Sequence, residues 1–223
     1  GPAAVVSVSA SPRLPHAAAP GLAGRAGPVA LEVAGLHPSA GGGAAALASQ
    51  QLRDTAGAHA FWRQLDALVP ASDAAARRQS AWLGAELALA AGQPQQALDL
   101  VERHPAPQLR PAVLLHAQAQ LALQRPALAS ERLQTWVTTH PQDAQAWQWL
   151  AQAWQAQNQP LRALRAQAEA QVAIRDFSAA QDRLKAAQDL ARRGSNQDHI
   201  EASIIDTRLR AVTELRREGA RKQ

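Results

Sequence analysis

The sequence contains no cysteine, no methionine and no tyrosine, and its few aromatic residues are six tryptophans and two phenylalanines. Without cysteine the chain forms neither disulfides nor thiolate-ligated metal sites, and the redox compartment cannot be read from cysteine pairing. No run of about 18 apolar residues is present, so we expect no membrane span. Methionine is missing even at position 1, and Gly1-Pro2 is typical of the scar left after removal of an expression tag. We therefore expect an excised segment of a longer protein.

Positive charge is in excess, with a net charge of +5 and a pI of about 11.1. Such a balance makes nucleic acid a partner to consider. Much of the excess lies near the C-terminus, in Arg208, Arg210, Arg216, Arg217, Arg221 and Lys222. Arginine far outnumbers lysine, which in an alanine-rich chain indicates a GC-rich genome more than selection for phosphate binding. We predict no nucleic-acid partner, and a short basic tail over residues 220–223.

The first part of the chain differs in composition from the rest. Residues 3–43 are rich in Ala, Gly and Pro, which predicts an irregular arm or linker with at most two short extended stretches. From about residue 44 the pattern becomes helical, because Ala and Gln are abundant and β-branched residues are sparse. We predict one helical domain over residues 44–219.

A small residue recurs at the start of alternate predicted helices. These positions are Ala58, Ala97, Ala129 and Ala163. The last two steps between them are nearly equal, and Pro94, Pro126 and Pro160 each stand three positions before the alanine. Proline suits the first turn of a helix, where its missing N–H has no partner. The spacing therefore predicts repeated helical hairpins.

The unit length and its small and large residues resemble the tetratricopeptide repeat (TPR), a helix–turn–helix of about 34 residues. Residues 142–170 match best, and the units are degenerate: Gln167 stands where a large apolar residue is usual, and one unit ends raggedly around "ERHPAP". Small residues let helices approach while Trp and Leu fill the space beside them. The residues assigned to structural TPR positions are Ala58, Trp62, Ala97, Ala129, Trp136, Pro141, Trp147, Leu150, Ala151, Trp154, Ala163, Ala170, Phe177 and Ala180. Trp149 falls off this pattern, so we expect it to be partly exposed or at a junction.

The C-terminal part of the pattern shortens. Ala180 follows Ala163 by only half of the preceding step, so the helix near 160–174 is predicted to be the second helix of one unit and the first of the next. Gly194 suits a helix C-cap. A last amphipathic helix, predicted over about 197–219, carries Ile200, Ile204, Ile205, Leu209, Val212 and Leu215. The predicted fold is an all-α, TPR-like solenoid of about four to five degenerate repeats, with a C-terminal capping helix and an irregular N-terminal arm.

Motifs that carry catalytic chemistry are missing from the sequence. There is no His-Glu-x-x-His pair, nucleophile elbow, phosphate loop or dinucleotide fingerprint. The seven histidines are His16, His37, His59, His104, His116, His140 and His199, and no two have helical i, i+4 spacing. We predict no catalytic residue, no metal site and no cofactor in this segment.

A TPR stack offers a groove lined by the first helix of each unit. In the best unit the residues offset from the core form an amide stripe of Gln145, Gln148, Gln152 and Gln155. The two preceding units place Leu114, Gln118 and Leu121, and Gln79, Trp82 and Glu86, in the same role. Amides donate and accept together, which suits a polypeptide partner. The equally open alternative is that Gln is only the polar filler of a solvated face.

The last third is also similar to the C-terminal TPR region of periplasmic BepA-like zinc metalloproteases. The stretches "LQTWVTTHPQDAQAWQWLAQAW" and "DHIEASIIDTRLRAVTELRRE" carry the resemblance, with Ile200 to Arg210 matching the closing signature and His199 in place of the usual aromatic. The resemblance covers about residues 44–219. It implies a module that docks on its own protease domain and contacts clients and the outer-membrane assembly machinery in the periplasm. The zinc and the catalytic residues would belong to a domain absent from this chain.

Three functions remain open from the sequence. The first is a non-catalytic, polypeptide-binding module of such a protease, which would act in outer-membrane quality control. The second is a stand-alone TPR scaffold with an unrelated partner. The third is a basic, nucleic-acid-binding helical repeat.

Overall fold

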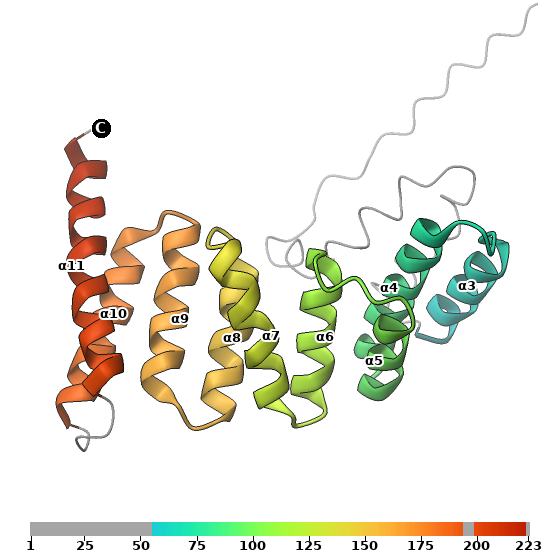
Figure 1. Ribbon diagram of the computed structural model, residues 1–223, viewed down its shortest axis with the longest axis horizontal. Helices are drawn as coiled ribbons and strands as arrows, with labels where there is room; N and C mark the ends of the chain where they lie inside the picture. Colours follow the sequence, from blue (N-terminus) through green and yellow to red (C-terminus); the bar gives the residue numbers. More distant parts are fainter. Residues whose placement is uncertain (1–54, 194–198, 222–223) are drawn as a thin grey trace, which may run out of the picture.

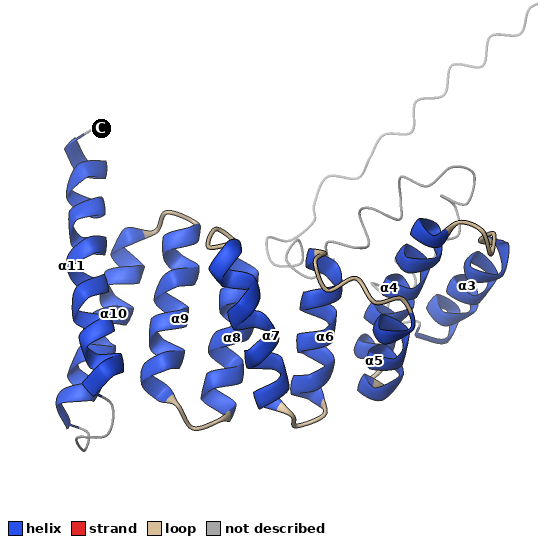
Figure 2. Cartoon of the chain, in the orientation of Figure 1, coloured by secondary structure: helices blue, strands red, loops and turns tan. Residues whose placement is uncertain are grey.

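The computed structural model describes residues 55–193 and 199–221, and the elements drawn there are helices joined by short loops (Figure 2). The predicted scar, the arm over 3–43 and Gly194 lie outside the described residues. The described helices are α3 (Thr55–Leu68), α4 (Ala74–Ala90), α5 (Pro94–Arg103), α6 (Arg110–Ala122), α7 (Pro126–Thr139), α8 (Ala144–Ala156), α9 (Pro160–Ala173), α10 (Phe177–Arg193) and α11 (His199–Arg221). The all-α prediction is confirmed for this part of the chain.

The helices follow one another in a row from α3 to α11, and each packs against the next (Figure 1). A second set of contacts joins alternate helices, because α4 touches α6 and α6 touches α8. Beyond α8, it is α9 that touches α11. Consecutive packing of this kind is typical of a helical repeat, in which each unit buries its apolar face against its neighbours.

Two neighbouring helix pairs repeat each other along the chain. The pair α6–α7 and the pair α8–α9 begin and end at equivalent positions, so that Arg110 corresponds to Ala144 and Pro126 to Pro160 at the same offset. We call this offset one repeat. In each pair the proline occupies the first turn of the second helix. The repeat spacing read from the alanines and prolines thus corresponds to a repeat of the backbone.

A left-handed residue marks the turn inside each hairpin. Gly92, Gln124 and Asn158 have φ of 72°, 59° and 56° and lie between α4 and α5, α6 and α7, and α8 and α9. Arg175, with φ of 63°, occupies the same place between α9 and α10. The α9–α10 turn is therefore of the hairpin type, and α9 both closes one hairpin and opens the next, as the halved step predicts.

The alanines at the start of the second helices are fully enclosed. Ala58, Ala97, Ala129, Ala163 and Ala180 are each 1% exposed or less. They let the helices approach closely, because a larger side chain has no room at such a contact. Three clusters of buried side chains run along the row and together form its core.

The tryptophans divide between the core and its edge. Trp62, Trp136 and Trp154 are buried, as predicted. Trp147 is only half-buried, and its indole N–H donates to the carbonyl of Pro141 at 3.0 Å. It therefore lies at the edge of the core and not inside it as predicted. Trp149 is half-buried beside the same cluster, as expected of a residue off the pattern.

At the N-terminal end of the described chain, α3 is held close to α4 by one aromatic contact. Trp62 lies so near Gly84 that a Cβ there would come within 2.3 Å of the indole ring. The indole N–H donates to the carbonyl of Ser80 at 2.8 Å, and the Ser80 hydroxyl donates to Asp66 at 2.7 Å. Glycine is needed here because the close approach leaves no space for a side chain.

The last helix, α11, runs to Arg221, so residues 220 and 221 belong to the helix and not to a tail as predicted. Ile205 and Val212 are fully buried against the preceding helices. Ile200 and Ile204 were predicted on the same packed stripe, but they are 82% and 42% exposed, because they lie on the side of α11 turned away from α10. Within the described parts of the chain, every helix is too short or too polar to cross a membrane.

Candidate functional site: an amide stripe and a polar hollow

The amide stripe lies on the solvent side of α8. Gln148, Gln152 and Gln155 are exposed. Gln145 is half-buried, and its side-chain oxygen accepts a hydrogen bond from Arg110 at 3.1 Å. Three of the four predicted amides are therefore available to a partner, and the fourth is already engaged within the protein.

The stripe does not continue along the earlier units as predicted. Trp82 and Leu114 are buried at 3% and 2% exposure, so the prediction that they line an open groove is wrong. The reason is enclosure: α4 lies among α3, α5 and α6, and α6 lies among α4, α5, α7 and α8, which leaves little free surface on either. The remaining predicted groove residues of these two helices are partly buried: Gln79, Glu86, Gln118 and Leu121.

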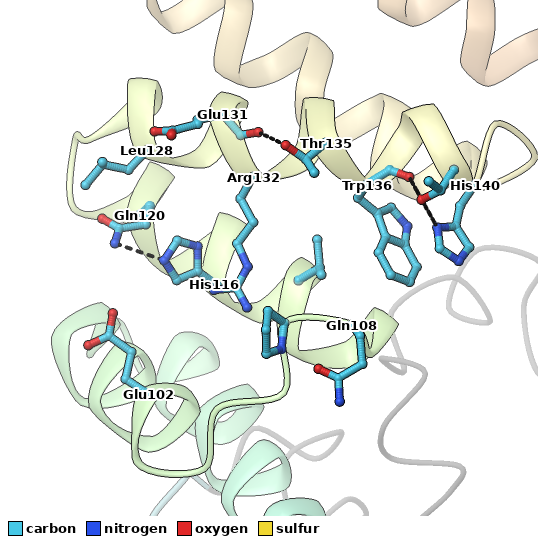
Figure 3. Close-up of a pocket in the computed structure, with 13 residues that line it drawn as sticks. Glu102, Gln108, His116, Gln120, Leu128, Glu131, Arg132, Thr135, Trp136 and His140 are labelled. Carbon is cyan, nitrogen blue, oxygen red and sulfur yellow. Dashed lines mark hydrogen bonds between the residues drawn. The ribbon is translucent and has the colours of Figure 1, made fainter.

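A hollow lies over α6, between α5 and α7. We call it the α6 hollow; it has a volume of about 680 Å³. Its floor is Val113, His116 and Gln120 of α6, which share one helix face (Figure 3). The hollow exists because α5 ends at Arg103, and the chain then leaves along an irregular stretch before α6 begins at Arg110. This is the ragged stretch noted in the sequence.

The two polar residues of the floor contact each other and leave hydrogen-bonding atoms unused. The side-chain nitrogen of Gln120 lies 3.4 Å from Nε2 of His116. Gln120 is 4% exposed, and its side-chain oxygen is buried without a partner among the described residues. Nδ1 of His116 is likewise buried and unpartnered. Buried polar atoms normally have partners, so two unused atoms on neighbouring side chains of one hollow indicate a site for something else.

Charged side chains stand on both walls of the α6 hollow. Arg132 reaches from α7 toward His116, and Glu102 lies on the opposite wall, on α5 (Figure 3). Burial lowers the pKa of Arg132, while the charge of Glu102 raises it. Burial, together with the charge of Arg132, lowers the pKa of His116 to about 4. His116 is therefore a neutral ring at physiological pH.

A smaller hollow of about 380 Å³ lies over α8, between α7 and α9. We call it the α8 hollow, and its floor is Trp147, Leu150 and Trp154. These positions lie one repeat beyond the three floor residues of the α6 hollow. Sequence reasoning missed the α6 hollow, although aligning the two units would have shown His and Gln where the other unit has Leu and Trp.

A third hollow of about 630 Å³ surrounds the α7–α8 turn and is organised by Asp143. Arg110 donates to both carboxylate oxygens of Asp143, at 2.7 and 2.8 Å, and the indole of Trp136 donates at 3.0 Å. Burial alone would raise the pKa of Asp143, but these bonds and the amide of Ala146 outweigh it and hold that pKa below its usual value. Because both oxygens of Asp143 are engaged, this cluster is structural.

No group of three His, Asp or Glu side chains within 55–193 and 199–221 is close enough to share a metal ion. Comparison with protein-family models and with curated proteins found no match to this chain. The arguments for function therefore rest on the residues and their geometry.

Proposed function

We propose that this chain is a non-catalytic, polypeptide-binding module of the helical-repeat class. The observation that carries the proposal is the exposed, uncharged row of Gln148, Gln152 and Gln155 on α8. Each amide can donate and accept at once, so the row can pair with the N–H and C=O groups of a bound chain. Its neighbours along the described chain are packed helices, which hold the row in a fixed position.

The resemblance described above supports a narrower form of the proposal. In that form the chain is the TPR region of a BepA-like zinc metalloprotease, docks on that protein's catalytic domain, and works in the periplasm on clients of outer-membrane assembly. A gene without an upstream His-Glu-x-x-His motif would overturn this parentage. A stand-alone scaffold would then be the better account of the same surface.

The binding proposal is tested with a permanently unfolded polypeptide, such as reduced and carboxymethylated α-lactalbumin, carrying a fluorescent label. The full chain is expected to bind it saturably, and replacing Gln148, Gln152 and Gln155 by Ala to weaken binding several-fold. The matched control is Gln96→Ala, at an exposed glutamine on α5. Equal affinity of the triple variant and the control would contradict the proposal.

Salt distinguishes polypeptide binding from nucleic-acid binding. An uncharged amide surface predicts little change in affinity as salt rises, whereas phosphate recognition weakens steeply with salt. Measuring the same titration with a single-stranded oligonucleotide in low and high salt checks this. Tight, salt-sensitive oligonucleotide binding would favour the basic helical repeat instead.

A further inference from the structure

We propose that the α6 hollow is a second binding site, which holds a neutral amide group, with an apolar neighbour, between His116 and Gln120. The amide would come from the backbone of a short peptide segment or from an Asn or Gln side chain. The site does not depend on the amide stripe. Gln118 is the residue of α6 that lies one repeat before Gln152 of the stripe. His116 and Gln120 are each two residues from Gln118, so they lie about 200° from it around α6, on the opposite face.

The first argument is the exchange of residue types between equivalent positions. In the α8 hollow the floor is Trp147, Leu150 and Trp154, which pack within or against one core cluster. In the α6 hollow the same backbone positions carry Val113, His116 and Gln120, and the free volume is about 680 Å³ against about 380 Å³. Exchanging packed residues for polar ones costs stability, and such a cost is characteristic of binding sites.

The second argument is the hydrogen-bonding pattern of the floor. The Gln120 side-chain nitrogen can only donate, so Nε2 of His116 accepts and the ring proton is on Nδ1. The floor then offers one unused donor, the Nδ1–H of His116, and one unused acceptor, the Gln120 side-chain oxygen. An amide supplies the complement of both, through its C=O and its N–H. A carboxylate accepts only and would leave the Gln120 oxygen unpaired.

The third argument is the balance of charge and apolar surface. Arg132 on one wall is offset by Glu102 on the other, and the His116 ring is neutral. A strongly charged ligand would therefore meet opposition from one wall. Val113 and Leu128 supply apolar contact beside the polar floor. The volume lies within the roughly 300–1,000 Å³ typical of small-ligand sites.

The test uses small amides on the full chain labelled with nitrogen-15. N-acetyl-leucine N-methylamide offers peptide groups only, and 4-methylpentanamide offers a primary carboxamide on a similar apolar tail. The carboxylate 4-methylpentanoate is the isosteric control. We expect saturable shifts of the α6 backbone amides with one or both amides, with a Kd on the order of 1 mM for so few atoms. The amide that binds better identifies the source.

Two variants locate the binding at the floor. His116→Leu introduces the residue that the next unit has at Leu150, and Gln120→Leu removes the unused acceptor. Each is expected to weaken amide binding about tenfold, as for loss of one buried hydrogen bond. Gln118→Ala, on the opposite face, should leave the Kd unchanged. Circular dichroism melting confirms that each variant is folded.

The outcomes decide the proposal. Saturable binding of an amide that both Leu variants weaken and Gln118→Ala does not would support it. Preference for the carboxylate, no saturable shift with either amide, or equal affinity of the folded Leu variants and the parent chain would overturn it. Because Gln148, Gln152 and Gln155 are unchanged throughout, a failure here is separate from a failure of the stripe.

Discussion

The helix pairs α6–α7 and α8–α9 share their bounds and their turns one repeat apart, yet their contents differ. In the second pair, Asp143 caps the N-terminus of α8, and Trp147, Leu150 and Trp154 form the floor of the hollow. The first pair begins after Leu109, which supplies no side-chain cap, and its floor carries His116 and Gln120. The path of the backbone therefore depends on a few positions that both pairs share, and the other positions are free to serve packing or binding.

The shared positions are the enclosed alanines and the turns. Ala129 and Ala163 are both fully buried, and Gln124 and Asn158 are both left-handed. A small residue at a helix contact and a reversal at the turn set the spacing and the direction of the hairpin, whatever the floor contains. Exchanging residues between the two pairs tests which positions set the backbone and which are free.

The largest effect is expected from Leu150→His, which places the residue of the first pair in the second. Leu150 is 2% exposed, so the change loses apolar packing and buries a ring without partners. We expect the free energy of unfolding to fall by about 3–5 kcal/mol. The reverse exchange, His116→Leu, should be neutral or stabilising by about 1 kcal/mol, because an unused buried donor disappears. Urea unfolding of both variants checks this, and equal losses would show that the two floors are equivalent.

A smaller effect is expected from Asp143→Leu, which copies Leu109. The change removes the cap of α8 and the carboxylate that accepts hydrogen bonds from Arg110 and Trp136. We expect a loss of about 2–4 kcal/mol, measured by thermal or urea unfolding. Leu109→Asp, the converse, should gain up to about 1 kcal/mol by capping α6. A neutral Asp143→Leu would mean that the cluster around this carboxylate contributes little.

The shared position is tested by Ala163→Leu. Ala163 is fully buried, so a larger side chain would force α8 and α9 apart. The expected loss of unfolding free energy is about 1–3 kcal/mol. Calorimetry should show a similar loss for Ala129→Leu, because the two positions are equivalent. A large difference between them would contradict the shared role of these alanines.

The smallest effect concerns pH. The folded-state pKa of His116 is about 4 against an ordinary value of 6.5, so the unfolded chain binds the proton more readily. Stability from this group is full above pH 6.5 and is lost as pH falls toward 4. Between about pH 7 and about pH 4.5 the parent chain should lose about 1–2 kcal/mol more than His116→Leu, after allowance for solvent screening.

The difference between the two chains isolates His116. Burial and nearby arginines also lower the pKa of His104, which acts over the same range in both chains. The lowered pKa of Asp143 acts below its ordinary value of 3.8, outside this window. Urea unfolding at the two pH values provides the measurement, and identical pH dependence of the two chains would contradict a buried neutral His116.

Local signals predicted much of the fold. The prolines at Pro126 and Pro160 and the alanines three positions later located the second helix of each hairpin, because both act within one turn of helix. The halved step between Ala163 and Ala180 correctly indicated that α9 belongs to two hairpins. The stripe on α8 was found for the same reason: helical spacing alone places residues on one face.

Burial was decided by neighbours distant in the sequence. Trp82 and Leu114 have the same spacing as the stripe on α8, but α4 and α6 are enclosed by other helices, and Ile200 and Ile204 are exposed because α11 turns them away from α10. The three floor residues of the α6 hollow share a face because of helical spacing, whereas the space beside them exists because α5 ends at Arg103. The helices, their turns and their period follow from the amino-acid sequence, because they are local properties of the chain. Which helix faces meet other helices and which stay open depends on the packing of the whole row, because burial is set by neighbours distant in the sequence.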